Sequence, residues 1–263
     1  MDDTTFVSLA WLDAHRTAPD VRVVDVREAW EFDGIGHVPG AVSVPFERVR
    51  SAGGADAGML PGAAAFAQVL GEVGVDSDDT IVAYDDTFGV FAARFVVTAL
   101  VYGHRDVRLL DGDFSAWNRE YAVTTEPTPT TPTDYDARPV PTDATPLIDR
   151  ADVAAALESD ALLVDTREEW EYAEAHLPGA VRFDWREVVD DESRTLKPRD
   201  ALVDLLSARG ITPDRRIVLY CNTARRISHT YLVLRWLGYE DVDFYEGSLT
   251  EWLDEGGVVE TGD

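Results

Sequence analysis

The chain of 263 residues contains a single cysteine, Cys221. A disulfide within the chain needs two thiols, and a metal site built on thiolates needs several, so the sequence excludes both kinds of site. Whatever chemistry Cys221 performs, it performs as a lone thiol.

Basic residues are scarce as well. The chain has 23 basic against 50 acidic residues, a formal net charge of -27, and one lysine, Lys197. This charge disfavours binding to nucleic acid or to anionic membranes. Molar salt shortens the Debye length to about 3 Å and would screen the repulsion among the carboxylates. The composition therefore indicates a salt-adapted protein, as from a halophilic archaeon; an acidic protein from ordinary salt is the alternative.

Long hydrophobic runs are missing too. No apolar run approaches the roughly 18 residues of a membrane span, and the longest candidate, residues 88–103, contains Arg94 and Thr98. The N-terminal residues show no basic segment followed by an apolar one, as a secretory signal would. We therefore expect a cytoplasmic protein that does not associate with membranes.

The chain does contain one sequence pattern that occurs twice. VVDVREAWEFDGIGHVPGAV at 23–42 is echoed by LVDTREEWEYAEAHLPGAV at 163–181, and TIVAYDDTFGVFAARF at 80–95 by RIVLYCNTARRISHTY at 216–231. Two blocks in the same order indicate a duplicated domain. The stretch between them, 124–146, is rich in Pro and Thr and lacks periodicity, which predicts a linker. The expected domains are 1–123 and 147–263.

Each half alternates short β-branched runs with helical patterns. Strands are predicted at 21–26, 81–84, 162–165 and 217–220, and helices at 61–73, 90–102, 151–158, 199–209 and 227–237, with Asp149 as an N-cap. This alternation predicts an α/β fold of two domains, each a parallel sheet flanked by helices on both faces. Ligands of such sheets bind beyond the carboxyl ends of the strands, where the loops after Tyr84 and Tyr220 lie.

Cys221 directly follows one of these strands and precedes an amphipathic helix. Unpaired N–H groups of residues 222–226 and the helix dipole would make this place electropositive, and Arg225 and Arg226 add formal charge. A free cysteine is only about 3% ionised at pH 7, and electropositive surroundings of this kind favour the thiolate. An inert buried cysteine is the alternative. The pattern favours a reactive thiol.

At these residues the sequence resembles the rhodanese superfamily, over both halves of the chain. CNTARR resembles the six-residue active-site loop of tandem thiosulfate sulfurtransferases, and VDTREEWEYAEAHLPGAV resembles the first family signature. YEGSLTEW resembles the C-terminal signature, with Glu246 and Leu249 as departures. The resemblance implies transfer of sulfane sulfur from thiosulfate to cyanide or a thiol through a Cys221 persulfide, without a metal or an organic cofactor. A sulfur-accepting protein is a further partner to consider.

The resemblance also implies roles for residues. Cys221 would be the nucleophile and sulfur carrier. The donor would be held by a cradle of five residues: Asn222, Thr223, Ala224, Arg225 and Arg226. Asp165, Arg167 and Ser228 would support the loop, with helix capping as the alternative for Ser228. Some family members carry a substrate-binding arginine where this chain has Glu171, so the loop arginines are expected to bind the donor instead.

The first half lacks the nucleophile, because Asp85 stands where the second half has Cys221. A carboxylate cannot hold a transferable sulfur, so the first domain is predicted to be catalytically inactive and to support the second. Acidic residues are seldom fully buried, and we expect Asp85 and Asp86 to be solvated loop residues.

Other conspicuous residues are assigned to the scaffold. Asp25 and Asp165 are each followed by an arginine two residues later, which predicts Asp-to-backbone or Asp-to-Arg contacts that fix the loops; catalytic carboxylates are the alternative. His229, two helical turns after Cys221, is expected to face the core. Four tryptophans recur at matching places and are expected to serve packing rather than to form a ligand cage: Trp30, Trp117, Trp170 and Trp252.

Three other functions stay open: a 3-mercaptopyruvate sulfurtransferase, a persulfide relay module and a Cys-dependent phosphatase. The mercaptopyruvate enzymes tend to carry a small, uncharged loop, so the two arginines favour thiosulfate. The phosphatases share the fold and have an arginine six residues after the cysteine. Here that position is Ile227, and Arg226 comes one residue early. A loop one residue shorter suits sulfur better than a tetrahedral phosphate.

Overall fold

The computed structural model describes residues 5–53, 58–141 and 144–262. It divides into an N-terminal unit, Asp2–Pro141 with Asp190–Leu196, and a C-terminal unit, Thr142–Val189 with Lys197–Asp263. Residues 1–4, 54–57 and 263 of the predicted domains, and 142–143 of the predicted linker, lie outside the described residues.

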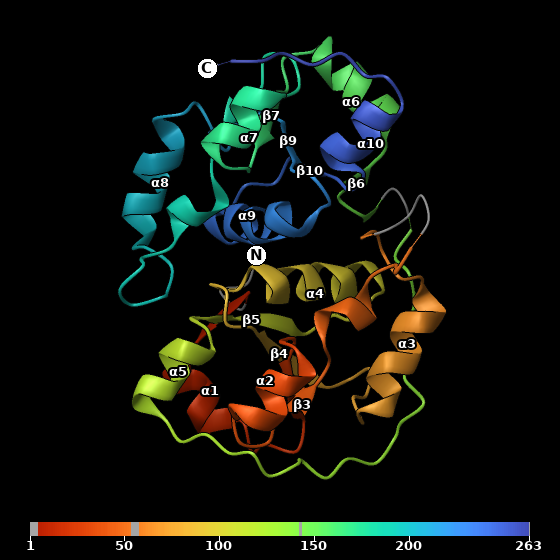
Figure 1. Ribbon diagram of the computed structural model, residues 1–263, viewed down its shortest axis with the longest axis vertical. Helices are drawn as coiled ribbons and strands as arrows, with labels where there is room; N and C mark the ends of the chain where they lie inside the picture. Colours follow the sequence, from red (N-terminus) through yellow and green to blue (C-terminus); the bar gives the residue numbers. More distant parts are fainter. Residues whose placement is uncertain (1–4, 54–57, 142–143, 263) are drawn as a thin grey trace. The chain divides into compact units, whose positions relative to one another are not determined.

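Each unit is built on a five-stranded parallel sheet, and the two sheets have the same topology (Figure 1). The N-terminal order is β1-β5-β4-β2-β3, and the C-terminal order is β6-β10-β9-β7-β8. The N-terminal strands are β1 (Phe6–Ser8), β2 (Val21–Asp25), β3 (Val42–Ser43), β4 (Thr80–Tyr84) and β5 (Val107–Asp111). The C-terminal strands are β6 (Leu147–Ile148), β7 (Leu162–Asp165), β8 (Val181–Arg182), β9 (Ile217–Tyr220) and β10 (Val242–Tyr245).

Helices connect the strands and cover the sheets. Those of the N-terminal unit are α1 (Leu9–His15), α2 (Ala29–Gly34), α3 (Ala63–Glu72), α4 (Val90–Val101) and α5 (Phe114–Glu120). Those of the C-terminal unit are α6 (Arg150–Leu157), α7 (Glu169–Glu174), α8 (Arg199–Ser207), α9 (Arg225–Leu237) and α10 (Ser248–Asp254). Asp149 caps α6, because its side chain accepts the backbone N–H of Asp152. The predicted α/β fold with two parallel sheets is confirmed.

The central strands are buried on both faces, which explains their continuous apolar runs. In β4, Val82 and Tyr84 pack in one hydrophobic cluster with Trp117 of α5. Ile81 and Ala83 alternate with them and are fully buried as well, so they point to the opposite face, where α4 lies (Figure 1). Strand β9 is buried in the same way along its whole length. The central strands β4 and β9 thus offer only their ends and the following loops for chemistry.

The stretch predicted as a linker lies against the N-terminal unit in its described first part. Tyr135 is buried, and its hydroxyl is hydrogen-bonded to His104 Nδ1 at 2.9 Å. The N–H of Arg138 donates to the carbonyl of Tyr102 at 2.8 Å. Gly103 passes so close, at φ +85°, that a Cβ there would lie 2.2 Å from the Arg138 carbonyl oxygen. Only glycine fits at this position.

A second segment of this unit, 190–196, comes from the sequence of the second repeat. The guanidinium of Arg194 binds the buried carboxylate of Asp113, with Nε 2.8 Å from Oδ1, and the N–H of Leu196 donates to Asp111 Oδ1 at 2.7 Å. No motif in the sequence predicted this association, because it depends on isolated polar contacts between residues more than 80 positions apart.

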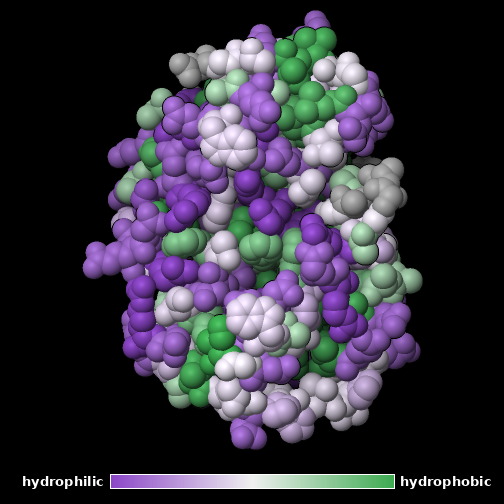
Figure 2. All heavy atoms as spheres, in the orientation of Figure 1, coloured by the Kyte–Doolittle hydropathy of each residue, from purple (hydrophilic) through white to green (hydrophobic). Residues whose placement is uncertain are grey.

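The surface is dominated by hydrophilic side chains on the face that Figure 2 shows.

The tryptophan prediction holds for Trp117 and Trp252, which are buried. It is wrong for Trp30 and Trp170, which are 65% and 64% exposed. Helix α2 buries Phe32, and two residues of helix rotate a side chain by about 200°, so Trp30 is turned to solvent. Within the described residues, no helix is long and apolar enough to cross a membrane.

Candidate active site

Cys221 lies at the carboxyl end of β9, where the chain turns towards α9. Hydrogen bonds fix the backbone on both sides: the N–H of Thr166 donates to the carbonyl of Tyr220 at 3.1 Å, and the N–H of Leu249 to that of Cys221 at 3.0 Å. The N–H of Cys221 itself donates to Ser248 Oγ at 3.1 Å. Cys221 is 2% exposed. The thiol therefore has a fixed place in the loop, and a reactant must enter the loop to meet it.

The five predicted cradle residues form the turn after β9 and the start of α9. Asn222 and Thr223 are partly buried, Ala224 is fully buried, and α9 begins at Arg225. Ala224 adopts φ 64°, a left-handed conformation that costs a non-glycine residue roughly 1–2 kcal/mol. The hydroxyl of Ser228 donates to the carbonyl of Ala224 at 2.8 Å. Ser228 thus stabilises the turn from within the helix and does not act as its N-cap.

The predicted Asp-to-Arg contacts are present in both units. Arg167 Nη2 lies 2.6 Å from Asp165 Oδ2, and both side chains are almost fully buried. Burial alone would lower the pKa of Arg167, but the hydrogen bonds and the charge of Asp165 outweigh it and raise the pKa. Arg167 Nη1 also donates to Asn222 Oδ1 at 3.2 Å, so the pair supports the residue directly after Cys221. Arg27 and Asp25 form the same contact at 2.6 Å.

Arg226, one of the two loop arginines, is paired with Glu171 of α7. The other oxygen of that carboxylate accepts the side-chain amide of Asn222 at 2.8 Å. Burial favours a higher pKa for Glu171, but these partners, Arg226 above all, bring it below its usual value. In the sequence, Glu171 stands where some family members have a substrate-binding arginine. In the structure, its carboxylate binds Asn222 and Arg226 of the cysteine loop.

The N-terminal unit repeats this loop with a carboxylate in the place of the thiol. The carbonyl of Asp85 accepts the N–H of Phe114 at 2.8 Å, as that of Cys221 accepts from Leu249, and Phe88 has φ 55°, close to that of Ala224. The equivalence of Asp85 and Cys221, predicted from the repeat, is therefore confirmed by the backbone.

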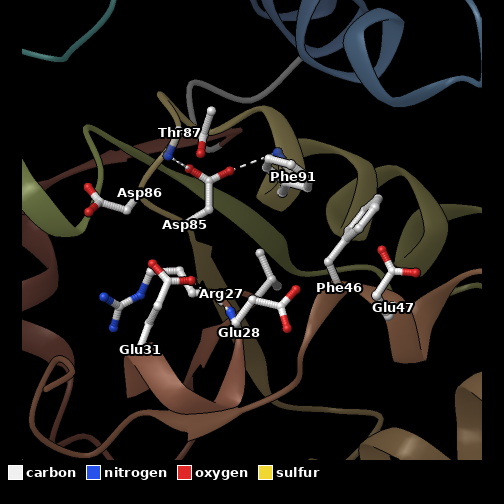
Figure 3. Close-up of a pocket in the computed structure, with 10 residues that line it drawn as sticks. Arg27, Glu28, Glu31, Phe46, Glu47, Asp85, Asp86, Thr87 and Phe91 are labelled. Carbon is white, nitrogen blue, oxygen red and sulfur yellow. Dashed lines mark hydrogen bonds between the residues drawn. The ribbon is translucent and has the colours of Figure 1, made fainter. Parts of the chain in front are cut away.

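The expectation that Asp85 is a solvated residue is wrong. Its carboxylate is buried and accepts four backbone N–H groups, of which Figure 3 shows those of Thr87 and Phe91. These donors are Thr87 and Gly89 to Oδ1, at 2.7 and 2.8 Å, and Phe91 and Ala92 to Oδ2, at 2.7 and 3.0 Å. The amides of the loop and of the first helical turn replace water as hydrogen-bond donors to the carboxylate, so the charge can be buried. Asp86 is partly exposed and pairs with Arg194 at 3.5 Å.

The carboxylate of Asp85 marks the position at which such a loop can hold negative charge. By equivalence, the amides that would surround a charged group on Cys221 belong to four residues: Thr223, Arg225, Ile227 and Ser228. Sequence reasoning overlooked Ile227, because its side chain is apolar and its contribution is the backbone N–H. The cradle around Cys221 stays a prediction that this equivalence supports.

A cavity of about 250 Å³ opens beside Asp85 (Figure 3). Phe46 and Phe91 form part of its wall. Its ionisable lining residues are Arg27, Glu28, Glu31, Glu47, Asp85 and Asp86. Five carboxylates against one guanidinium disfavour an anionic ligand, so the charge of this cavity fits the prediction that the N-terminal unit does not take the sulfur donor.

Asp85 predicts a pH dependence of stability. Burial raises its pKa to about 6, against the lowering effect of the four N–H groups. Between pH 6 and 4 the folded protein holds this proton more tightly than the unfolded chain, so protonation stabilises the fold as the pH falls.

We expect the free energy of unfolding of the wild type, relative to Asp85→Asn, to rise by about 1.4 kcal/mol for each unit by which the pH falls in this window. Urea unfolding of both proteins at a series of pH values measures this difference. A difference that does not change with pH would contradict a raised pKa.

His229 faces the core, as predicted. It is 2% exposed, its ring meets Trp185 edge-on at 5.6 Å, and burial lowers its pKa to about 4. The imidazole is therefore neutral near pH 7 and serves packing. In the described part of the chain, no group of three or more His, Cys, Asp or Glu side chains could hold a metal ion.

Comparison with known proteins identifies the family to which this architecture belongs. The model of the Rhodanese-like domain matches residues 8–120 and again 149–255. The chain belongs to the rhodanese family. The two matches coincide with the two repeats of the sequence, and the predicted family and fold are confirmed.

Relatives of known name span nearly the whole chain. A thiosulfate sulfurtransferase of Pseudomonas aeruginosa is 33% identical over 89% of this chain and 89% of its own length. The sulfur carrier protein TtuD of Thermus thermophilus is 32% identical, over 96% and 94%. A relative from Haloferax volcanii is 31% identical, over 97% and 96%. Together with the two rhodanese-like domains, these relatives confirm the predicted class of enzyme, a sulfurtransferase.

Solved structures agree on the fold. An anaerobic ergothioneine biosynthesis enzyme from Chlorobium limicola matches with a TM-score of 0.87. The match covers 99% of this chain and 71% of the enzyme's chain, at 20% sequence identity. At that identity the likeness supports the fold alone.

Proposed function

We propose that this rhodanese moves sulfane sulfur from thiosulfate to cyanide or a thiol, with Cys221 as the carrier. The observation that carries the proposal is the lone cysteine of the chain, fixed at a strand end in a loop whose twin in the N-terminal unit buries an anion on four amides. Such amides stabilise negative charge wherever it develops on the sulfur. Named sulfurtransferases among the relatives give independent support.

The chemistry takes two steps that need no oxidant or reductant from outside. The Cys221 thiolate attacks the outer sulfur of thiosulfate; the new S–S bond forms, the S–S bond of the donor breaks, and sulfite leaves as a dianion. Cyanide then attacks the outer sulfur of the persulfide, thiocyanate leaves, and the thiolate returns. The negative charge on the loop is the same before and after each step, which suits a fixed set of N–H donors.

3-Mercaptopyruvate is the alternative donor, and the arginines of the loop argue against it. Arg225 and Arg226 lie within one helical turn of a protein of net charge -27, and although Arg226 is paired with Glu171, the loop is richer in cations than its surroundings, which favours a dianion such as thiosulfate. A persulfide relay to a protein acceptor is the second alternative, supported by the relative named as a sulfur carrier. The phosphatase is disfavoured by the short loop.

The test is a set of parallel assays on the purified chain. Thiocyanate formation is measured with thiosulfate and cyanide, and then with 3-mercaptopyruvate in place of thiosulfate; hydrolysis of p-nitrophenyl phosphate is the third assay. We expect the highest kcat/KM with thiosulfate and no phosphatase activity. Persulfide formation without repeated turnover on cyanide would favour the relay, and absence of a persulfide would reject all sulfur-transfer alternatives.

We also propose that the protein works in the cytoplasm at high salt. At a net charge of -27, removal of potassium chloride lengthens the range of carboxylate repulsion from about 3 Å to 10 Å or more. We expect the unfolding temperature and the thiocyanate-forming activity both to fall as potassium chloride is lowered from 2 M to 0.1 M. A chain of unchanged stability and activity at low salt would contradict salt adaptation.

A further inference from the structure

Glu171 connects α7 to both ends of the cysteine loop. Its Oε1 accepts the side-chain amide of Asn222 at 2.8 Å, and its Oε2 accepts Arg226 Nη1 at 2.5 Å. Asn222 directly follows Cys221, and Arg226 lies in the first turn of α9. The Glu171 side chain is 7% exposed and that of Arg226 18%, so water screens this ion pair weakly. One carboxylate therefore holds the loop at its start and at its end.

The contacts continue from Glu171 to the buried pair below the loop. The other end of the Asn222 side chain accepts Arg167 Nη1 at 3.2 Å, and Arg167 is held by Asp165. Asn222 thus bonds through its oxygen to Arg167 in the loop after β7 and through its nitrogen to Glu171 of α7. A side chain bound at both ends has one orientation, and it fixes the backbone next to Cys221.

The pairing also decides how much positive charge the loop offers. Arg226 is held against a carboxylate at hydrogen-bond distance, so much of its charge is neutralised where an anionic donor would arrive. If Glu171 were absent, this guanidinium would be available to the donor. The pairing with Glu171 therefore weakens the attraction of the loop for the anionic donor and keeps the loop rigid.

The N-terminal unit contains the same glutamate without these contacts. Glu31 accepts the N–H of Glu28 at 3.0 Å, as Glu171 accepts that of Glu168 at 3.2 Å, and both residues complete a capping box. The positions that match Asn222 and Arg226 are Asp86 and Val90, and neither side chain can donate to a carboxylate. The cap is common to both repeats, whereas the bonds to the loop belong to the unit with the cysteine.

We propose that Glu171 is a positioning residue for sulfur transfer: it holds Asn222 and Arg226 so that the loop keeps its shape around the Cys221 sulfur. The proposal rests on the sulfurtransferase function given above. It makes Glu171 matter for the rate of the chemical steps more than for the affinity of the donor. A misplacement of about 1 Å in such a site can cost about a hundredfold in rate.

The experiment compares Glu171→Gln with Glu31→Gln as a matched control. Both changes remove a carboxylate from a capping box, and only the first leaves the loop with a neutral amide that cannot serve both donors. We expect Glu171→Gln to lower kcat for thiocyanate formation about tenfold or more, without a rise in the KM for thiosulfate, because Arg226 is released towards the anion. Glu31→Gln should keep the kinetics of the wild type.

Two further measurements keep the test decisive. The double variant Glu171→Gln/Arg226→Gln should lose less than the product of the two single losses, because each single change disrupts the same contact. Wild-type Cys221 should gain about 32 Da with thiosulfate, one sulfur atom, whatever the role of Glu171. If that adduct fails to form, the proposed function fails; if it forms and Glu171→Gln behaves like Glu31→Gln, or raises KM at unchanged kcat, the positioning role is refuted.

Discussion

Replacement of Cys221 by serine is expected to reduce thiosulfate-dependent formation of thiocyanate to background, a loss of at least about a thousandfold. A serine hydroxyl is not ionised near neutral pH and cannot carry a sulfane sulfur that a second nucleophile collects. The change is nearly isosteric, and the surrounding bonds use the backbone: the N–H of Cys221 donates to Ser248 and its carbonyl accepts from Leu249. The fold should therefore survive while the chemistry is lost.

The matched control is Thr87→Ala, in the loop of the N-terminal unit, where the Thr87 side chain is exposed and the bond to Asp85 uses the backbone N–H. This variant should keep its activity. Mass spectrometry after exposure to thiosulfate should show the gain of about 32 Da in the wild type and in Thr87→Ala, and no gain in Cys221→Ser. Turnover that survives in Cys221→Ser would refute the persulfide mechanism, because the chain has no second thiol.

The sequence was sufficient for the fold because its two strongest signals are local and repeated. Strands β7 and β9 begin and end at the predicted residues, since runs of buried β-branched and apolar residues stop where the polar loops begin. Helix ends were less well placed. Helix α9 starts two residues before the predicted Ile227, because the arginines of the loop already adopt helical geometry.

Asp85 shows why a preference for the surface can mislead. Acidic residues are rarely buried because a buried carboxylate needs partners, and a sequence does not reveal how many N–H groups a loop directs at one point. Here the loop supplies four. The equivalence of Asp85 with Cys221 was visible in the repeat, and it could have suggested that the two side chains share an anion-binding environment.

Contacts between distant residues account for what was missed in the C-terminal unit. Glu171 stands 51 positions before Asn222 and 55 before Arg226, and no spacing rule connects them. The sequence shows the departure from the family pattern at Glu171, but the contacts of this residue depend on the position of α7. The Asp-to-Arg pairs were predictable because both partners lie two residues apart, at the end of a strand.

Replacement of Asp165 by asparagine is expected to cost about 3–5 kcal/mol of unfolding free energy. The change removes the carboxylate that binds Arg167, whose side chain is 4% exposed, and leaves a buried guanidinium without its hydrogen-bonded counter-ion. Such a loss is a large share of the roughly 5–15 kcal/mol by which a domain is stable. Asp25→Asn should cost a similar amount, because its pair with Arg27 is equally buried.

The two variants should differ in activity. Arg167 reaches Asn222 beside Cys221, so Asp165→Asn should also lower kcat for thiocyanate formation, whereas Asp25→Asn should change stability alone. Asp136→Asn serves as the exposed control, since the pair with Arg138 is open to water and its loss should cost less than about 1 kcal/mol. Urea unfolding at constant high salt gives the three stabilities. A cost for Asp165→Asn no larger than that of Asp136→Asn would mean that the buried pair does not hold the loop, and the support we assign to Arg167 would have to be withdrawn.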